Sequence, residues 1–257
     1  MAYTNPLLER WAAGGVVYSG WVSSGEPLIA GFLAGCGYDE VLVDLQHGAV
    51  EIGHLSGVFA TIEGRGVAPA VRVAANDPML IGRVLDLGAL SVMVPLVESR
   101  EEAERAVAAC RYPPVGRRSM GPIRAMTTIG SYQAVDLASV ACIVQVETAA
   151  GLRNVDAIAS TPGLTGVFIG PSDLALSLGL DEADPAAGSA REAAHAAILE
   201  TCRRHGIVTG IITSNGTEAV KRLEQGFRLV ALTSDIALIM DGGIEQLRIA
   251  RSAKLPA

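Results

Sequence analysis

The sequence Ala141–Gly179 reads ACIVQVETAAGLRNVDAIASTPGLTGVFIGPSDLALSLG and contains two apolar runs that each lead into a carboxylate. The first run ends at Glu147, and the second continues into Gly170-Pro171-Ser172-Asp173. Apolar residues between the runs recur at roughly helical spacing, so the stretch is predicted to be a βαβ unit with two parallel strands. Glu147 and Asp173 then lie at the same edge of the sheet, where paired carboxylates suit a hard divalent cation. The alternative is that both are ordinary loop acids that cap helices.

The rest of the chain repeats this alternation of apolar runs and helical patterns. Strands are predicted at 16–22, 40–45, 68–73, 91–97, 141–146, 166–169, 207–213 and 227–232. Helices are predicted at 5–13, 26–34, 50–63, 149–159, 189–205, 217–225 and 243–252, with two more that begin after Asp77 and Ser99. One long irregular segment, 112–135, interrupts the pattern, and loops of that length are usually functional. Eight βα units predict a (β/α)8 TIM barrel that forms a single domain over residues 1–257; a doubly wound sheet is the alternative.

In such a barrel, the polar residues at the strand ends face one rim. They are Asp44, Gln46, His47, Arg72, Gln145, Glu147, Ser172 and Asp173. His47 follows a strand end with Asp44 three residues earlier, which fits a general base held by a carboxylate. The alternative for His47 is a histidine that is merely hydrogen-bonded to the barrel top. Arg72 ends an apolar strand, so its charge is expected to meet Glu147, Asp173 or an anionic substrate, or to form a purely structural ion pair.

The amino-acid composition argues against several classes of function. The formal net charge is −7 and no basic tract is present, so nucleic acid is not an expected partner. No apolar run approaches the roughly 20 residues that span a bilayer, and the N-terminal sequence has no signal-peptide pattern, so a cytoplasmic protein is expected. The only lysines are Lys221 and Lys254, and neither sits where a Schiff-base enzyme needs a desolvated amine. His54, His195 and His205 lie in or beside helical patterns and are interpreted as ordinary surface or boundary residues.

Five sequence blocks in order resemble the HpcH/HpaI aldolase family of metal-dependent, class II pyruvate aldolases. They are Asp44-x-x-His47-Gly48, Val71-Arg72-Val73 with Asn76-Asp77-Pro78, Arg111-Tyr112-Pro113-Pro114-x-Gly116, Gln145-Val146-Glu147-Thr148, and Phe168-Ile169-Gly170-Pro171-Ser172-Asp173-Leu174. The resemblance covers about residues 5–252. It implies reversible cleavage of a 4-hydroxy-2-oxo acid to pyruvate and an aldehyde, through a metal-stabilised enolate of pyruvate.

The resemblance also implies a role for each site residue. Glu147 and Asp173 would hold a divalent metal, Mg²⁺ or Mn²⁺ with Co²⁺ as a substitute, while Gln145, Ser172, Asp173 and Arg72 would bind the pyruvate part. His47 would be the acid/base, Asp44 its companion at the strand end, and Arg72 the group that stabilises developing negative charge. Asp86 would raise the basicity of His47 across a subunit contact. Family members look like hexamers, arranged as dimers of trimers with exchanged C-terminal helices.

One departure from the family pattern concerns the residue before the histidine. Many members carry Glu there, whereas this chain has Gln46, which changes the charge around the metal water and His47. Two other functions stay open. The first is an acyl-CoA lyase of the citrate lyase β or malyl-CoA lyase type, for which Arg117, Arg118 and Arg124 would be available. The second is a non-catalytic carboxylate-binding protein. The segment after Tyr112, together with a neighbouring subunit, is expected to build the aldehyde pocket.

Overall fold

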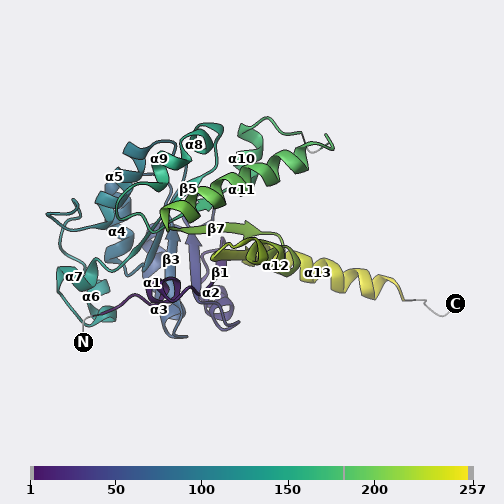
Figure 1. Ribbon diagram of the computed structural model, residues 1–257. Helices are drawn as coiled ribbons and strands as arrows, with labels where there is room; N and C mark the ends of the chain where they lie inside the picture. The colour runs from purple at the N-terminus through teal and green to yellow at the C-terminus, as the bar shows by residue number, and fades with distance from the viewer. Residues whose placement is uncertain (1–2, 182, 254–257) are drawn as a thin grey trace.

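The computed structural model describes residues 3–181 and 183–253 and contains a closed barrel of eight parallel strands in sequence order, β1 to β8 (Figure 1). The strands are β1 (Val17–Val22), β2 (Glu40–Asp44), β3 (Ala68–Arg72), β4 (Ser91–Val94), β5 (Ala141–Val146), β6 (Gly166–Ile169), β7 (Val208–Thr213) and β8 (Leu229–Ser234). The predicted (β/α)8 barrel is therefore confirmed. Each strand pairs with its neighbours in sequence, and β8 pairs with β1 to close the ring.

Helices surround the strands and connect their ends. They are α1 (Pro6–Ala12), α2 (Pro27–Ala34), α3 (Leu55–Glu63), α4 (Pro78–Asp86), α5 (Arg100–Cys110), α6 (Ile123–Ile129), α7 (Ala134–Leu137), α8 (Ala149–Arg153), α9 (Val155–Ala159), α10 (Pro171–Ser177), α11 (Ala187–His205), α12 (Gly216–Gln225) and α13 (Asp235–Arg251), with a 3₁₀ turn η1 (Ile52–His54) before α3. Of the part of the chain described, no helix is long and apolar enough to cross a membrane.

Local sequence signals explain where several helices begin. The Asp77 side chain accepts hydrogen bonds from the N–H groups of Met79 and Leu80, and Pro78 occupies the first position of α4. Ser99 caps α5 by accepting from the Glu102 N–H, and Asn215 caps α12 in the same way. These contacts satisfy N–H groups that the first helical turn leaves unpaired.

Two apolar cores hold the barrel. The outer core lies between the strands and the surrounding helices and includes Phe59, Ile81 and Ile198. The inner core fills the barrel itself and includes Leu42, Met93, Ile143 and Phe168, with Leu7 of α1 packed against it. Because most strand residues are buried, on either face, the strands are near-continuous apolar runs rather than alternating ones.

Three predicted segments differ most from the structure. The helix expected over 149–159 is two helices, α8 and α9, that meet at Asn154. The segment 112–135, expected to be irregular, contains α6 and the start of α7. The last helix begins at Asp235 instead of 243, because Ser234 caps it by accepting from the Ala237 N–H and the helix continues through Gly242 and Gly243.

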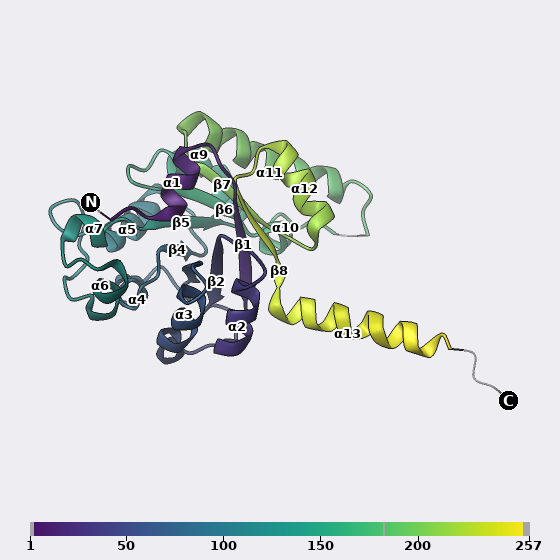
Figure 2. The same ribbon diagram turned by 90° about the horizontal axis from the view of Figure 1, so that it is seen from below.

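Helix α13 projects away from the barrel as a long arm (Figures 1 and 2). Within the described chain, its only sizeable contacts are with β1 and β8. Its exposed apolar residues are Ile236, Leu238, Ile239, Met240, Ile244, Leu247 and Ile249. A helix with this much apolar surface in water is unusual for a chain that acts alone.

Candidate active site

A pocket of about 320 Å³ opens where the strands end. Its lining comes from β1, β2, β3, β5, β6, β7 and β8 and the loops that follow them. The lining residues are Trp21, Ser23, Asp44, His47, Arg72, Gln145, Phe168, Gly170, Pro171, Ser172, Asp173, Ile212 and Ser234. Six of the eight residues predicted to face this rim line the pocket, and Gln46 and Glu147 flank it.

Arg72 and Asp44 form a two-pronged ion pair at the base of the pocket. Arg72 donates from Nε to Asp44 Oδ1 at 2.9 Å and from Nη2 to Oδ2 at 2.6 Å. The two residues are direct partners in the register of β2 and β3, which accounts for the pairing. Burial alone would raise the pKa of Asp44, but the bonds from Arg72 and from two backbone N–H groups outweigh it and hold the pKa below its ordinary value. The ion-pair partner of Arg72 is thus Asp44, not Glu147 or Asp173, while the expected contact with an anionic substrate stays a prediction.

Trp21 is a site residue that the sequence analysis missed. Its ring lies under the guanidinium of Arg72, 4.8 Å from ring centroid to Cζ, and its Nε1 donates to Asp44 Oδ2 at 3.3 Å. Phe168 supports it from β6, with the two ring centroids 6.0 Å apart. The aromatic face and the ion pair together fix the direction of the guanidinium. Two features of the sequence could have indicated that Trp21 belongs to the site. Tryptophan is rare in this chain, and Trp21 is next to last in its strand.

His47 lies in the turn after β2 with its side chain exposed at the pocket. Asp44 Oδ1 accepts hydrogen bonds from the backbone N–H groups of Gln46 and His47, at 3.0 and 3.3 Å. Asp44 therefore positions His47 through its backbone and not, as expected, by holding the imidazole. Gly48 closes the turn so tightly that a Cβ there would collide with the Asp44 carbonyl oxygen.

Glu147 lies just after β5, with 1 % of its surface exposed. Its Oε1 accepts from the Leu96 N–H at 2.8 Å, and its Oε2 accepts from Gln145 Nε2 at 2.6 Å. Gln145 and Glu147 point to the same side of the strand, as their two-residue spacing predicts. Burial, followed by the nearby charge of Asp173, raises the pKa of Glu147 to about 6, while the Leu96 N–H and Arg72 act in the opposite direction.

The donor set at this place suits a hard cation with oxygen ligands. Asp173 lies in the first turn of α10, close enough for its charge to act on Glu147. Gln145 Oε1 is buried and has no hydrogen-bond partner among the described residues. No group of three His, Cys, Asp or Glu side chains with a metal-site arrangement occurs in residues 3–181 and 183–253. Two carboxylates and an amide oxygen still fit Mg²⁺, which usually binds one or two carboxylates and completes its shell with water and substrate.

Gly170 makes room for these groups. A Cβ at this position would lie 2.6 Å from Gln145 Nε2 and would collide with Glu147 Oε2. The strand-to-helix turn between β6 and α10 therefore passes directly over the two side chains. Only glycine permits this approach at the site.

Asp86 and the segment after Tyr112 lie at the other end of the barrel. Asp86 ends α4, a helix that runs back from the strand ends, and accepts from Arg118 Nη2 at 2.9 Å. Arg124 binds Glu63 at the end of α3 at 2.6 Å. Figure 1 places α6 and α7 at the lower end of the barrel, with α8 and α10 at the upper end. Neither Asp86 nor this segment is therefore brought to the pocket of its own chain.

Lys221 is placed as expected. Lys221 lies on α12 with 55 % of its side chain exposed and binds Glu192 at 3.1 Å. Lys254 lies outside the described residues. A Schiff-base lysine needs desolvated surroundings, and the exposed, ion-paired Lys221 lacks them, so it is unsuited to that role.

Comparison with known proteins identifies close relatives over nearly the whole chain. A 2-dehydro-3,6-dideoxy-6-sulfogluconate aldolase of Pseudomonas putida is 37 % identical over 92 % of this chain and 93 % of its own. A hydroxypyruvate/pyruvate aldolase of Rhizorhabdus wittichii is 36 % identical over 96 % of this chain and 99 % of its own. The crystal structure of an HpcH/HpaI aldolase/citrate lyase family protein from Burkholderia cenocepacia superimposes with a TM-score of 0.89 at 32 % identity, covering 97 % of this chain and all of that one. Residues 18–242 match the HpcH/HpaI aldolase/citrate lyase family, and the chain belongs to that family.

Proposed function

We propose that the protein is a metal-dependent aldolase that cleaves a 4-hydroxy-2-oxo acid to pyruvate and an aldehyde, and joins them in reverse. The observation that carries the proposal is the meeting of the Glu147–Asp173 carboxylate pair with the locked Arg72 guanidinium around one small pocket. The two curated relatives described above are named for aldolases, which supports the same chemistry.

Glu147 and Asp173 would hold the divalent cation, Mg²⁺ or Mn²⁺ with Co²⁺ as a substitute, and Gln145 would contribute its unpaired amide oxygen. When bound, such a cation would supply Lewis acidity toward the 2-oxo group of the substrate. Arg72 places a fixed positive charge beside the same oxygen, because Asp44 and Trp21 prevent the guanidinium from turning away. The N–H groups at the start of α10, together with Ser172, would receive the substrate carboxylate.

His47 would move the proton. In cleavage, a base takes the proton from the 4-hydroxyl group, the C3–C4 bond breaks, and the electron pair stays on the pyruvate part. In synthesis, the same imidazole returns the proton to the new hydroxyl oxygen. The exposed imidazole of His47 at the pocket mouth can reach solvent to exchange that proton, and its backbone is fixed by Asp44.

An acyl-CoA lyase is the less favoured function. Two of the arginines that would hold a CoA phosphate are engaged at the opposite end of the barrel, Arg118 with Asp86 and Arg124 with Glu63. Neither is brought to the pocket of the same chain.

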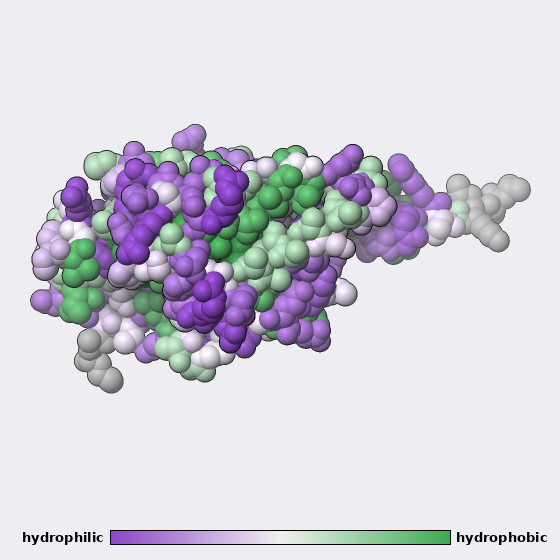
Figure 3. All heavy atoms as spheres, turned by 45° about the horizontal axis from the view of Figure 1, so that its top comes forward, coloured by the Kyte–Doolittle hydropathy of each residue, from purple (hydrophilic) through white to green (hydrophobic). Residues whose placement is uncertain are grey.

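We further propose that the chain acts as one domain within a homo-oligomer. The apolar surface of α13 would pack on a second copy, in line with the helix exchange that the family resemblance implies for hexamers. Figure 3 shows this arm beside the body of the molecule, on which a band of apolar side chains is also exposed. A neighbouring copy would then bring its Asp86 end toward the pocket. Sedimentation of the native chain and of a chain ending at 234 tests this: loss of the oligomer on truncation is expected.

Exchange of the pyruvate methyl protons in D₂O, followed by NMR, tests the aldolase proposal without knowledge of the aldehyde. Exchange is expected with Mg²⁺ or Mn²⁺ and is expected to stop with chelator and in Glu147→Ala. Glu200→Ala, a change to an exposed acid on α11, serves as the matched control and should exchange like the native protein. Exchange that survives complete chelation would rule out the proposed chemistry.

A further inference from the structure

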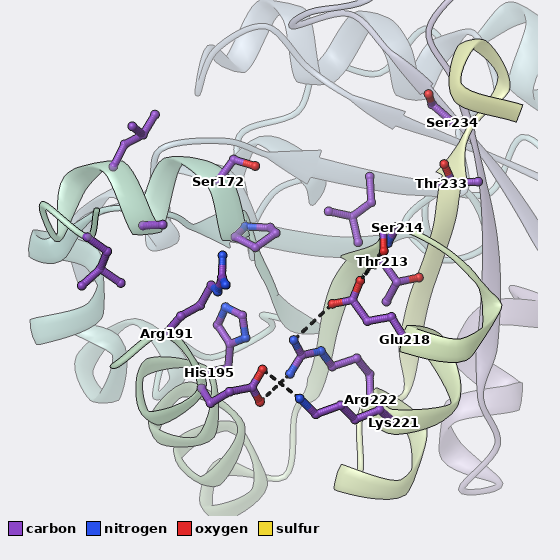
Figure 4. A pocket seen from close by; sticks show the side chains of 16 residues that line it. Ser172, Arg191, His195, Thr213, Ser214, Glu218, Lys221, Arg222, Thr233 and Ser234 are labelled. Carbon is purple, nitrogen blue, oxygen red and sulfur yellow. Dashed lines mark hydrogen bonds and ion pairs between the residues drawn. The ribbon is translucent and has the colours of Figure 1, made fainter. Parts of the chain in front are cut away.

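A second, larger pocket of about 940 Å³ opens beside the candidate active site, over the ends of β7 and β8 (Figure 4). Ser172, Ile212 and Ser234 line both pockets, so the two share a wall. His195 of α11 lines the larger pocket with 2 % of its surface exposed, so the prediction of a surface or boundary residue was wrong. Ser234 ends β8, and the next residue, Asp235, begins α13. The helical arm therefore starts at the wall of the active site.

Asp235 is a buried carboxylate that binds the loop after β1. Its Oδ1 accepts hydrogen bonds from the Ser23 N–H and the Ile236 N–H, each at 2.8 Å. Its Oδ2 accepts from the Ser24 N–H at 3.1 Å and from the Ser24 hydroxyl at 2.5 Å. Only 3 % of the Asp235 surface is exposed. The first residue of α13 thus holds a loop that lies 212 residues earlier in the sequence.

The backbone that leads into Asp235 has an unusual conformation. Thr233 has a φ of 49°, in the left-handed region that β-branched residues rarely adopt. Such strain persists only where surrounding contacts fix the chain, and it gathers at functional sites. The hydrogen bonds from Ser23 and Ser24 to Asp235 are contacts of this kind. They hold the start of α13 against the loop.

The same loop binds the turn that carries His47. The Ser23 carbonyl oxygen accepts from the Ala49 N–H at 2.7 Å, two residues after His47. Gly48 passes so close that a Cβ there would lie 2.9 Å from the Ser23 oxygen. Ser23 therefore connects the two elements through its own backbone, because its N–H donates to Asp235 and its carbonyl accepts from the His47 turn.

The turn is in this way held from two sides. On the side of β2, Asp44 accepts from the His47 N–H at 3.3 Å. On the side of β1, Ser23 binds Ala49, and Ser23 itself lines the active-site pocket. A reacting group displaced by about 1 Å can lose roughly 10²-fold in rate. Whatever fixes the loop after β1 therefore bears on the chemistry of His47.

We propose that Asp235 is a positioning residue for His47 and acts through Ser23. The inference rests on the proposed aldolase function, in which His47 moves the proton of the 4-hydroxyl group. Asp235 lies outside the lining of the active-site pocket, so it acts on the loop and not on the substrate. Its loss should slow proton transfer at His47 while the pyruvate part still binds at Arg72.

Asp235→Ala separates rate from binding. We expect kcat for cleavage of 4-hydroxy-2-oxopentanoate to fall by about tenfold to a hundredfold, because the His47 turn is then held from one side only. Calorimetric titration with pyruvate and Mg²⁺ should give the native Kd and the native number of sites. A role in stability alone would lower the number of sites together with kcat. Asp235→Asn keeps one acceptor oxygen and should retain more of kcat than the Ala variant.

Asp39→Ala is the matched control. Asp39 also accepts a backbone N–H of β1, that of Tyr18 at 2.9 Å, but at the opposite end of the barrel. This variant should keep the native kcat, and sedimentation checks that both variants keep the native oligomer. An unchanged kcat in Asp235→Ala, or an equal loss in the two variants, would overturn the inference.

Hydrogen exchange tests the contact without any substrate. Deuterium uptake at the Ala49 N–H, followed by mass spectrometry with residue-level fragmentation, should be slow in the native protein and at least tenfold faster in Asp235→Ala. Asp235→Asn should lie between the two, and it keeps the test independent of the folding of the Ala variant. The Leu45 N–H, which donates to the Arg72 carbonyl at 2.9 Å, should not change.

Equal uptake at Ala49 in the native protein and both variants would overturn the inference even if the enzyme cleaves its substrate. Pyruvate methyl exchange by the native protein, without aldehyde, reports separately on the proposed function. A failure of the aldolase proposal is thus distinguished from a failure of the role assigned to Asp235.

Discussion

Strand β2 carries a buried carboxyl group at each end, and both point into the barrel. The two groups differ in their hydrogen-bond partners. Asp44, at the C-terminal end, accepts hydrogen bonds from Arg72, Trp21 and two backbone N–H groups. Glu40, at the N-terminal end, is 1 % exposed, and neither of its carboxyl oxygens has a hydrogen-bond partner within the described chain. Burial raises the pKa of Glu40 to about 7, with the neighbouring Ser19 hydroxyl acting in the opposite direction.

The two carboxyl groups of β2 differ in whether the protein keeps them ionised. The charge at the C-terminal end is kept ionised by its partners, which a fixed electrostatic site requires. At the N-terminal end, burial instead shifts Glu40 toward the protonated acid, because the Ser19 hydroxyl does not make up for the loss of water. Position inside the barrel alone therefore does not make a polar residue a catalytic candidate, because its partners decide whether it stays charged.

Removing Asp44 is expected to lower the stability of the protein, and this is the largest of the expected effects. Asp44→Ala leaves the Arg72 guanidinium buried without its partner, which typically destabilises a protein by about 3–5 kcal/mol. Urea unfolding at pH 7.5 measures the loss. Glu245→Ala breaks the exposed Glu245–Arg248 pair and should leave the unfolding midpoint unchanged. A similar midpoint for both variants would contradict the view that the Asp44 pair is desolvated.

Changing Arg72 is expected to act on rate more than on stability. Arg72→Lys keeps a positive charge but loses the two-pronged bond to Asp44, so the charge is no longer fixed beside the 2-oxo group. A decrease in kcat of about 10²–10³ is expected, as for the loss of one preorganised donor. Steady-state aldol cleavage measures it, with Arg204→Lys on the exposed face of α11 as the control. A rise in KM with unchanged kcat would assign Arg72 to binding alone.

Glu40→Gln should make the protein more stable at high pH. The pKa of Glu40 is about 7 in the folded state against an ordinary 4.5, so native stability falls as the pH rises through this window. The difference between a pKa of about 7 and the ordinary 4.5 corresponds to roughly 3 kcal/mol in the free energy of unfolding, which the variant should recover at pH 8. The gain should shrink toward pH 5, and urea midpoints at both pH values measure it. Equal gains at the two pH values would show that Glu40 is ionised throughout.

Trp21→Phe is expected to change stability and kcat the least. The ring under Arg72 is retained, and only the 3.3 Å hydrogen bond from Nε1 to Asp44 is lost. We expect a loss of about 1 kcal/mol in the free energy of unfolding and less than a tenfold change in kcat. Trp21→Ala, which removes the ring as well, gives the comparison. Equal rates for the two variants would mean that the aromatic face does not hold the guanidinium.

Most of the barrel could be predicted from the sequence, because its strands are continuous apolar runs bounded by glycine and polar residues. The residues of the pocket followed from the rule that parallel strands present their C-terminal ends at one rim. The pairing of Arg72 was missed, although β2 and β3 end with opposite charges at matching positions. A register derived from the two strand ends would have placed Asp44 beside Arg72.

The burial of His195 and the start of α13 could not be predicted, because they depend on contacts between segments far apart in the sequence. His195 lies in a helix rich in alanine, where no pattern of large apolar residues marks the buried side. The early start of α13 was missed because the adjacent glycines Gly242 and Gly243 predict a break. Helix propensity is a weak guide when a cap and neighbouring strands fix the first turn, as Ser234 does here.

The wall shared by the two pockets has a consequence for how such enzymes diversify. The groups proposed for bond breaking come from the first six βα units, with His47 in the turn after β2 and Asp173 in α10. His195, Glu218 and Arg222 come from helices α11 and α12, later in the chain. Substitutions on these two helices can alter which molecules the larger pocket admits while the reactive centre stays intact. A mutagenesis library confined to residues 187–205 and 216–225, which leaves out β7 and its pocket residue Ile212, would vary the larger pocket without changing the groups proposed for bond breaking.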